Sequence, residues 1–572
     1  MYGTYWNCRK LTGSPVCGPN VTNFSNCYNN CRGFTGNPVC GPNVVNMSRA
    51  YDYCVNMKGK PVCGNNVVDM SLAYITCQNI TGSPVIGPNV TNASHTYQSC
   101  WYITGNPVIT DKITNMRNTY AWCIRLNGKP VCGNNVIDMS SAYMGSNGIT
   151  GSPVCGPNVT NMYETYNCCW NITGNPVCGP NVINMANCYN GCNNLTGAPI
   201  CGSVVTNMAN TYYNCYKLKG TPACGANVIN MFNTYYNCTN LTGNPVCNNN
   251  VASMHSTYYN CWNLTGSPVC GSKVTNMKNT YYNCRKLTGN PMCGNNVVDM
   301  NCAYYNCYNL TGSPVCGPNV TNMYSAYQYC NRITGSPACG PNVIDMDSTY
   351  YNCKNLNGNP VCGNKVTDMH STYYNCWNLT GKPVCGPNVI NMFRAYYDCE
   401  KITGSPVCGN NVVDVFASYS LCYNLTGSPV CGNNVVDFAF AYSYCTAITG
   451  NPVCGPNVTD MTYTYYNCHK LTGVAKFGNN VNRIDECYAY CVNLSAGDIY
   501  MYSNNIEYAY NCFLGKNKSR RYNIKAYRNT TTWNTLYINN TKSIVGANIT
   551  WTNYSNGGFY NTAYNIYILP IT

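Results

Sequence analysis

The feature that most constrains this chain is a 23-residue repeat that runs through most of its length. A cysteine recurs at this interval, at Cys8, Cys31, Cys54 and onward to Cys491, and only Ser146 interrupts the column. A second cysteine column, further along each repeat, runs from Cys17 to Cys454. No insertion or deletion shifts the period over residues 1–494. Such regular self-similarity indicates a solenoid, in which each coil buries its hydrophobic side against its neighbours.

One half of each coil predicts a short helix. In the coil of Cys77, the apolar residues are Met70, Tyr74, Cys77 and Ile80. They fall at positions i, i+4, i+7 and i+10, which is one face of a helix of two to three turns. Asp69 comes directly before them, and its side-chain oxygen can cap the first free amides of such a helix.

The other half of each coil predicts a short extended edge. Gly82 tolerates the positive φ with which helices often end. Pro84 lacks a backbone donor, so this edge is expected to be a very short strand or a polyproline-like run. The side-chain amide of Asn89 can bond to turn backbone and repeat from coil to coil. Because extended segments stack at ~4.8 Å and helices at ~8–10 Å, we expect the coils to wedge into a curved solenoid.

The helix half carries a resemblance to a known family. Residues 319–334 read Asn-Val-Thr-Asn-Met, then Tyr, then Cys-x-x-Ile-Thr. This stretch resembles the BspA-like leucine-rich repeats of bacterial surface proteins, although Tyr replaces their usual Phe and a short Pro-Val-Cys-Gly replaces a longer Leu-rich strand. The resemblance implies a leucine-rich-repeat solenoid that is displayed outside a cell and used for attachment. Similar repeats occur in phage and prophage fibre proteins.

The repeat ends before the chain does. We predict a solenoid of about 21 coils over residues 1–494, a degenerate last coil or cap over 495–515, and a β-rich domain over 516–572. Alternating apolar residues predict strands in the last of these, at 521–528, 533–538, 549–551 and 564–569. Its start is basic, with Lys516, Lys518, Arg520 and Arg521. Capping the solenoid, joining subunits and holding a receptor site are three open roles for this domain.

The first coil has no polar cap, because Met1 already stands in the methionine column. Solenoids need their ends covered. We therefore expect another subunit or an upstream segment to cover this coil, and we expect an oligomer.

The 45 cysteines allow three interpretations: disulfides of an exported protein, metal ligands, or small buried hydrophobic residues. Where the second column lacks its cysteine, Ile86, Ile109 or Phe477 stands instead, while Cys77 and Cys100 remain in the first column. Obligate pairs would be lost together, so we favour buried thiols, with scattered disulfides in the second column left open. Cys-x-x-Cys pairs are absent and there are only four histidines, so we predict no metal and no cofactor.

The sequence contains no pattern typical of an enzyme. It has no paired carboxylates, no nucleophile beside a base and no Gly-rich phosphate loop, so we predict a non-catalytic protein. The net charge of +14 is spread thinly, which argues against a nucleic-acid partner. The sequence contains no run of eighteen apolar residues, so we predict no membrane span.

Two surface columns of aromatic residues are the candidate ligand-binding site. An exposed stripe of aromatic and amide side chains suits sugar rings or another protein surface. The alternative is that the rings only cover neighbouring coils. The candidate residues are Trp101, Trp170, Tyr213, Tyr236, Tyr259, Trp262, Tyr282, Tyr305, Tyr308 and Trp377.

These patterns favour adhesion or recognition as the function. We expect the chain to bind a cell-surface glycan or protein receptor, at an extracellular surface or on a virion such as a bacteriophage tail fibre. The alternative is a structural protein whose uncapped solenoid ends stack into filaments.

Overall fold

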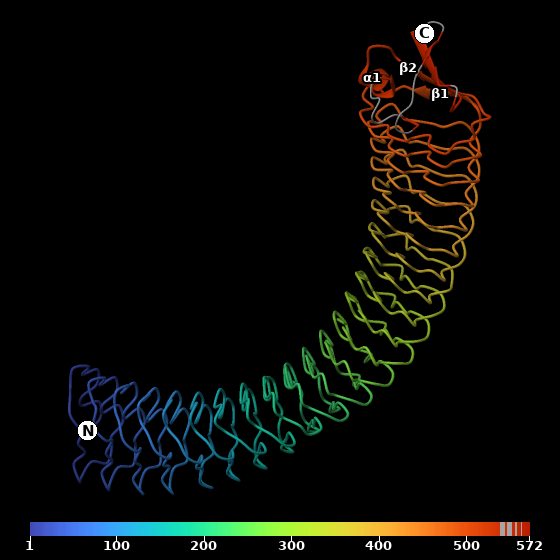
Figure 1. Cartoon of the computed structure of the whole chain (residues 1–572). Helices are drawn as coiled ribbons and strands as arrows, with labels where there is room; N and C mark the ends of the chain where they lie inside the picture. Colours follow the sequence, from blue (N-terminus) through green and yellow to red (C-terminus); the bar gives the residue numbers. More distant parts are fainter. Residues whose placement is uncertain (538–543, 546–551, 555–556, 562, 572) are drawn as a thin grey trace. The chain divides into compact units, whose positions relative to one another are not determined.

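The protein is a stack of 23-residue coils that ends in a small mixed β-sheet (Figure 1). The computed structural model describes residues 1–537, 544–545, 552–554, 557–561 and 563–571. It divides into two compact units, Met1–Leu287 (unit 1) and Thr288–Thr572 (unit 2). Within the described residues, no helix combines the length and the apolar character that crossing a membrane requires. The stack of coils and the C-terminal sheet confirm the repeat solenoid and the β-sheet that the sequence predicts.

The predicted core columns are buried. In the coil of Cys77, the side chains of Met70, Tyr74, Cys77 and Ile80 are all 0% exposed. Equivalent residues of the neighbouring coils are buried in the same way, so the columns form one continuous core along each unit.

The short helix predicted for each coil is not confirmed. The described residues of the 1–494 solenoid contain no α-helix, and the segment from Ser71 to Thr76 forms consecutive turns instead. Leu72 and Thr76 have φ of 56° and 60°, in the left-handed region that interrupts a right-handed helix.

The amides of this segment bond to the next coil instead of closing helical turns. Tyr74 N donates to Thr96 O at 2.9 Å and Thr76 N to Gln98 O at 2.7 Å, and both acceptors belong to the following coil. The amides that alternate with them turn back within their own coil: Ile75 N donates to Leu72 O at 3.3 Å and Cys77 N to Tyr74 O at 3.0 Å. A neighbouring coil thus supplies the acceptors that a helix would have supplied internally.

The residue expected to cap a helix has a related role at this turn. Asp69 Oδ1 accepts a hydrogen bond from Ser71 N at 2.9 Å, which is the geometry of an Asx turn. Asp69 also forms parallel β-bridges with Asn46 and Asn92 in the adjacent coils. The side chain therefore satisfies an amide as predicted, although at the start of a turn segment.

The tyrosine column closes each coil across its core. The hydroxyl of Tyr74 donates to Val62 O at 2.7 Å and accepts from Val62 N at 3.0 Å. The ring of Tyr74 stacks on that of Tyr97 in the next coil, with centroids 5.5 Å apart. One side chain therefore links the two halves of its own coil and packs against the neighbouring coil.

Apart from the exposed Cys8, the first cysteine column consists of buried thiols that donate hydrogen bonds. Cys77 Sγ donates to Tyr51 O of the preceding coil at 2.9 Å. The hydroxyl of Ser146 makes the equivalent bond to Tyr120 O, which explains why this residue can replace a cysteine. The second column is half-buried, and no disulfide joins the cysteines of the described residues. The chemistry of the first column is thus that of a small buried donor.

The Pro-bearing edge is irregular. The structure assigns no strand to the described edge residues around Pro84. Asn89 Nδ2 donates to Asn65 O of the preceding coil at 2.9 Å, which confirms the predicted asparagine ladder. A Cβ at Gly87 would lie only 2.7 Å from Gly64 O, so the close approach of successive coils requires glycine there.

The named strands and the helix all lie in the C-terminal part. They are β1 (Gly497–Met501), β2 (Tyr522–Ala526), α1 (Thr531–Tyr537), β3 (Thr552–Tyr554), β4 (Gly558–Asn561) and β5 (Ile566–Pro570). The sheet has the order β1-β2-β5-β4-β3; β1, β2 and β5 are parallel, and β4 is antiparallel to β5 and β3.

Two of the four predicted strands correspond to strands of this sheet. The strand predicted at 521–528 is β2, and the strand predicted at 564–569 is β5. The strand predicted at 549–551 lies outside the described residues. β1 comes from the segment 495–515 that we expected to be a degenerate coil or cap.

The strand predicted at 533–538 is wrong, because the described part of this segment belongs to helix α1. Thr530 Oγ1 accepts from Trp533 N at 3.2 Å and so caps the start of the helix. Trp533 and Leu536 are both buried, and their i, i+3 spacing places both on one face of a helix, whereas a strand would direct them to opposite faces. The burial pattern and the threonine cap therefore both favour the helix.

The C-terminal sheet covers the last coil of unit 2. Arg520 Nη1 donates to the carbonyls of Asn493 and Leu494, both at 2.6 Å. The hydroxyl of Tyr522 also donates to Leu494 O, at 2.8 Å. Phe513 continues the tyrosine stack by packing on Tyr488 at 5.8 Å. Of the three open roles of this domain, the structure thus shows capping of the solenoid.

Candidate functional site

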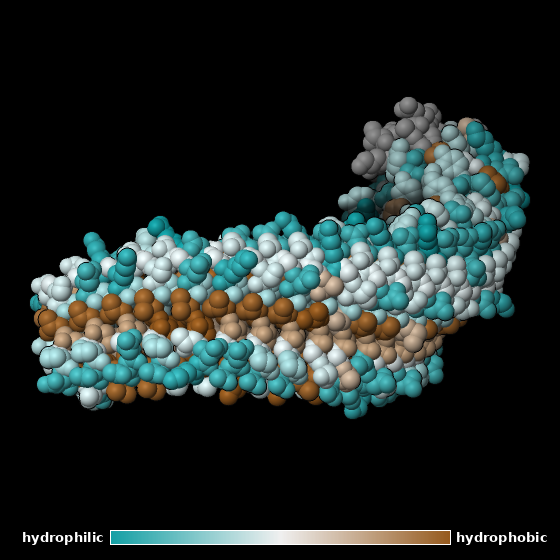
Figure 2. Space-filling model, turned by 90° about the horizontal axis from the view of Figure 1, so that it is seen from below, coloured by the Kyte–Doolittle hydropathy of each residue, from teal (hydrophilic) through white to brown (hydrophobic). Residues whose placement is uncertain are grey.

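The predicted aromatic residues do not converge on one site. Because every coil repeats the same outline, side chains of one kind form bands across successive coils (Figure 2). The ten candidates lie in two such columns, which differ in how far their rings are exposed.

The tyrosines of the first column stack on one another. In unit 1 the rings of Tyr213, Tyr236, Tyr259 and Tyr282 follow each other at 4.4–4.6 Å between centroids, with interplanar angles of 9° or less. They are half-buried. In unit 2 Tyr305 meets Tyr329 edge to face at 5.6 Å. Within the stack each ring face is occupied by its neighbour, which leaves mainly ring edges for a ligand.

The second column is more open. Trp101, Trp170, Trp262 and Tyr308 are 41–52% exposed. Trp377 is half-buried, since its Nε1 donates to Asp398 Oδ2 at 2.7 Å and Lys354 Nζ lies 4.0 Å from its ring centroid. These residues offer single ring faces on an open surface rather than an enclosed site.

A hollow forms where the tyrosine stack is interrupted. In unit 2 Tyr351, Tyr374 and Tyr397 stack at 4.5 and 4.7 Å, but the next two coils have Ser420 and Ser443 in this column. The column resumes with an aromatic ring at Tyr466. Two missing rings leave a hollow of about 470 Å3 on the surface of the coils, a volume within the range of sites for small ligands.

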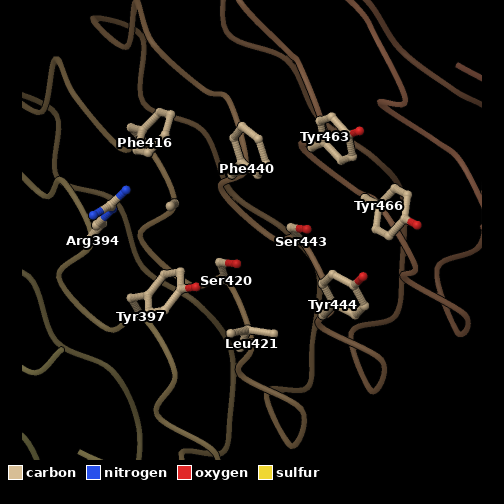
Figure 3. A pocket seen from close by; sticks show the side chains of 11 residues that line it. Arg394, Tyr397, Phe416, Ser420, Leu421, Phe440, Ser443, Tyr444, Tyr463 and Tyr466 are labelled. Atoms are coloured by element: carbon tan, nitrogen blue, oxygen red, sulfur yellow. The ribbon is translucent and has the colours of Figure 1, made fainter. Parts of the chain in front are cut away.

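Aromatic side chains surround this hollow, which we call the aromatic pocket. Figure 3 shows Ser420 and Ser443 within a ring of larger side chains that come from four successive coils. The pocket is lined by Arg394, Tyr397, Phe416, Ala417, Ser420, Leu421, Phe440, Ser443, Tyr444, Tyr463 and Tyr466.

Arg394 is the only lining residue that carries a charge at neutral pH. Its guanidinium carbon lies 5.6 Å from the ring centroid of Phe416 and 5.9 Å from that of Tyr397. In the part of the chain that the structure describes, no carboxylate lies within 4.0 Å of this guanidinium, and its buried Nε has no hydrogen-bond partner. The pocket therefore holds a positive charge that the protein does not neutralise by an ion pair.

The phenols of Tyr397, Tyr463 and Tyr466 stay protonated at neutral pH. Burial and the neighbouring Tyr444 raise the pKa of Tyr466 to about 12. Burial also raises the pKa of Tyr397. The pKa of Tyr463 is raised by burial and by the hydrogen bond that its hydroxyl donates to Glu486 Oε1 at 2.7 Å. The hydroxyls of Tyr397 and Tyr466 can therefore donate hydrogen bonds as well as accept them, whereas the proton of Tyr463 is already engaged by Glu486.

Sequence reasoning missed this pocket, although the signal was present. We searched for residues that recur in a column, whereas the pocket arises where the recurrence fails. The substitution of tyrosine by serine in two consecutive coils, with Phe416 and Phe440 nearby, marks the position.

The described histidine–carboxylate contact is not arranged as a catalytic triad. His370 Nδ1 lies 2.9 Å from Asp347 Oδ1, and Ser348 Oγ donates to the same carboxylate oxygen at 2.6 Å. A nucleophilic serine would have to bond to the histidine instead. Across the described residues, no three His, Cys, Asp or Glu side chains come together in a group suited to a metal ion.

No protein-family model matches the chain, and no curated protein does. The geometry of the pocket is therefore the basis on which function is argued.

Proposed function

We propose that this protein is a non-catalytic recognition protein that binds carbohydrate in the aromatic pocket. The observation that carries this proposal is the interruption of the tyrosine stack at Ser420 and Ser443, which opens ring faces that are covered elsewhere in the column. Sugar rings pack their C–H faces on aromatic rings and need hydroxyl partners at their edges.

The dimensions of the interruption suit a short oligosaccharide. Tyr397 and Tyr466 are three coil steps apart along the column, or about 14 Å at the ~4.8 Å spacing of stacked extended backbone. One or two pyranose rings fit between them. Ser420, Ser443 and the phenol of Tyr444 provide hydrogen-bonding groups along this length.

We further propose that the protein is displayed at a cell surface or on a virion, where it mediates adhesion or host recognition. A repetitive coil stack holds a site on a rigid scaffold, which suits recognition more than a reaction that requires conformational change. The resemblance of residues 319–334 to BspA-like repeats supports the same placement.

Restoring the repeat tests the carbohydrate proposal. The double variant Ser420→Tyr/Ser443→Tyr returns both coils to the residue of the neighbouring column positions, so it is expected to fold and to fill the pocket. We expect the unaltered protein to bind some of the oligosaccharides on a glycan array, and we expect the double variant not to bind them. The matched control is Tyr308→Ser, which removes an exposed ring outside the pocket. Binding of the double variant to the same oligosaccharides as strongly as the unaltered protein would refute the proposal.

A second candidate is self-association through an exposed apolar row. Ile137, Ile183 and Ile229 alternate with Thr160 and Thr206 in one column of unit 1 and are 49–52% exposed. Exposed apolar side chains along the coils favour lateral contact with another surface, which suits the oligomer expected from the sequence; the expected filament would instead use the solenoid ends. Sedimentation velocity of Ile183→Lys/Ile229→Lys is the test, and an unchanged sedimentation coefficient would exclude this row as the contact.

A further inference from the structure

The cation of the aromatic pocket has no anionic partner within the described protein. The guanidinium of Arg394 packs among Phe393, Tyr397 and Phe416, with its carbon 5.0–5.9 Å from their ring centroids. Its Nε is buried and lacks a hydrogen-bond partner. No ion pair of the described residues engages this guanidinium, which lines the pocket, so its terminal N–H groups are available to an acceptor that a ligand brings.

The surroundings hold the guanidinium in place for such a ligand. Aromatic neighbours restrict its rotation, so less entropy is lost when a ligand binds. Two acidic groups near the pocket already accept hydrogen bonds: Glu486 from Tyr463, which lines the pocket, and Asp398 from Trp377. Neither lines the pocket.

We propose that the aromatic pocket selects sugars that bear a carboxylate, and that Arg394 binds this carboxylate while a neighbouring ring face packs on the pyranose. This inference rests on the proposed carbohydrate function and adds the chemical class of the ligand. The planar guanidinium offers paired N–H donors that match the two oxygens of a carboxylate. Sialic acids and hexuronic acids share this chemistry.

The positions of Arg394, the aromatic rings and the serines favour a sugar that bears a carboxylate over a small free anion as the ligand. Arg394 lies at the edge of the hollow beside Tyr397, and the serines lie further along the interruption (Figure 3). An isolated anion would use only the guanidinium and leave the aromatic surface of the pocket uncovered. A sugar acid uses the charge, the ring faces and the hydroxyls together.

The test compares acidic probes with neutral counterparts of the same shape. Isothermal titration calorimetry on the full chain would use sialyllactose against its carboxyl-reduced form, and a hexuronic acid tetrasaccharide against its carboxyl-reduced form. We expect one acidic probe to bind at least about tenfold more tightly than its neutral counterpart, as a charge-assisted pair implies. The probe that shows this preference identifies the class of acid.

Two variants assign the preference to its cause. Arg394→Gln should reduce the affinity for the acidic probe to that of its neutral counterpart, while the neutral probe binds as before. Ser420→Tyr/Ser443→Tyr should abolish binding of both. Arg332→Gln is the matched control, because Arg332 also lies over a tyrosine ring, Tyr308 at 6.0 Å, but outside the pocket. Thermal denaturation of each variant verifies that it folds.

The outcomes separate the two proposals. Equal binding of acidic and neutral probes that is lost in the double serine variant would overturn the acid selectivity and retain carbohydrate binding. An acid preference that persists in Arg394→Gln would also overturn the selectivity mechanism. Binding that survives the double serine variant, or the absence of binding by every probe, would overturn both.

Discussion

The tyrosine that closes each coil can be tested by removing a single hydroxyl group. Tyr258 is 0% exposed, its hydroxyl donates to Val246 O at 2.7 Å, and it accepts from Val246 N at 2.9 Å. Its ring stacks between those of Tyr235 and Tyr281 at 5.4 and 5.5 Å. Tyr258→Phe keeps the ring and its stacking, so the variant isolates the two hydrogen bonds.

The expected cost follows from the groups that lose their partner. Both the N–H and the C=O of Val246 lose the tyrosine hydroxyl. A buried polar group left unsatisfied costs about 1–3 kcal/mol. Because Val246 is half-buried, water can replace part of the loss, and we expect a value in the lower half of that range.

Amide hydrogen exchange is the appropriate assay. In a solenoid each coil interacts mainly with its neighbours, so global unfolding of a long array is not a two-state measure. Exchange at Val246 should become about tenfold faster for each ~1.4 kcal/mol that is lost. Coils far from Tyr258 should exchange at their original rates.

The control is Tyr216→Phe, which removes the same atom from a ring that is 40% exposed. We expect no change in exchange for this variant. If Tyr258→Phe leaves the exchange of Val246 as slow as the control does, the tyrosine hydroxyls do not close the coils.

Three further predictions concern the cysteines and one acid. Cys261→Ser should leave the stability nearly unchanged, whereas Cys261→Val should lower it by about 1–3 kcal/mol in chemical denaturation, because valine overpacks the site and cannot donate to the carbonyl of Tyr235. A thiol reagent at pH 7.5 should modify the exposed Cys8 first and the other, buried cysteines of the first column only after unfolding, since burial keeps those thiols protonated and inaccessible; rapid modification of the first column in the native protein would contradict the buried core. Burial raises the pKa of Asp52 to about 6, so the native state binds a proton more tightly than the unfolded chain. Local stability should therefore be highest below about pH 4 and fall as the pH rises through 6, and Asp52→Asn should remove this dependence in exchange measured across the range.

Part of the fold could be predicted because a strict period makes equivalent residues share one environment. Met70, Tyr74, Cys77 and Ile80 were identified as core from their column alone, and each is buried. The asparagine ladder and the side-chain oxygen at Asp69 were also predictable, since a polar group that recurs in every coil needs a partner in every coil. Replacement of cysteine by Ile86 or Ser146 indicated that the thiols are part of the packing.

The sequence predicted that the candidate site would be aromatic, but it did not predict where the site lies. An aromatic surface was expected, but columns such as Tyr213 to Tyr282 cover their own ring faces. The pocket depends on how far apart two rings lie when the serines between them leave space. That distance is set by the stacking of coils and cannot be obtained from one coil.

The sequence by itself therefore determined the solenoid, its core columns and the residues that satisfy its turns. Only the tertiary structure decided where the backbone amides bond. The spacing of Met70, Tyr74 and Cys77 is compatible with a helix, yet Leu72 and Thr76 adopt positive φ and the amides pair with the next coil. The physical reason is that a hydrogen bond within a coil and one between coils satisfy the same amide, and the choice depends on whether the neighbouring coil places a carbonyl within reach.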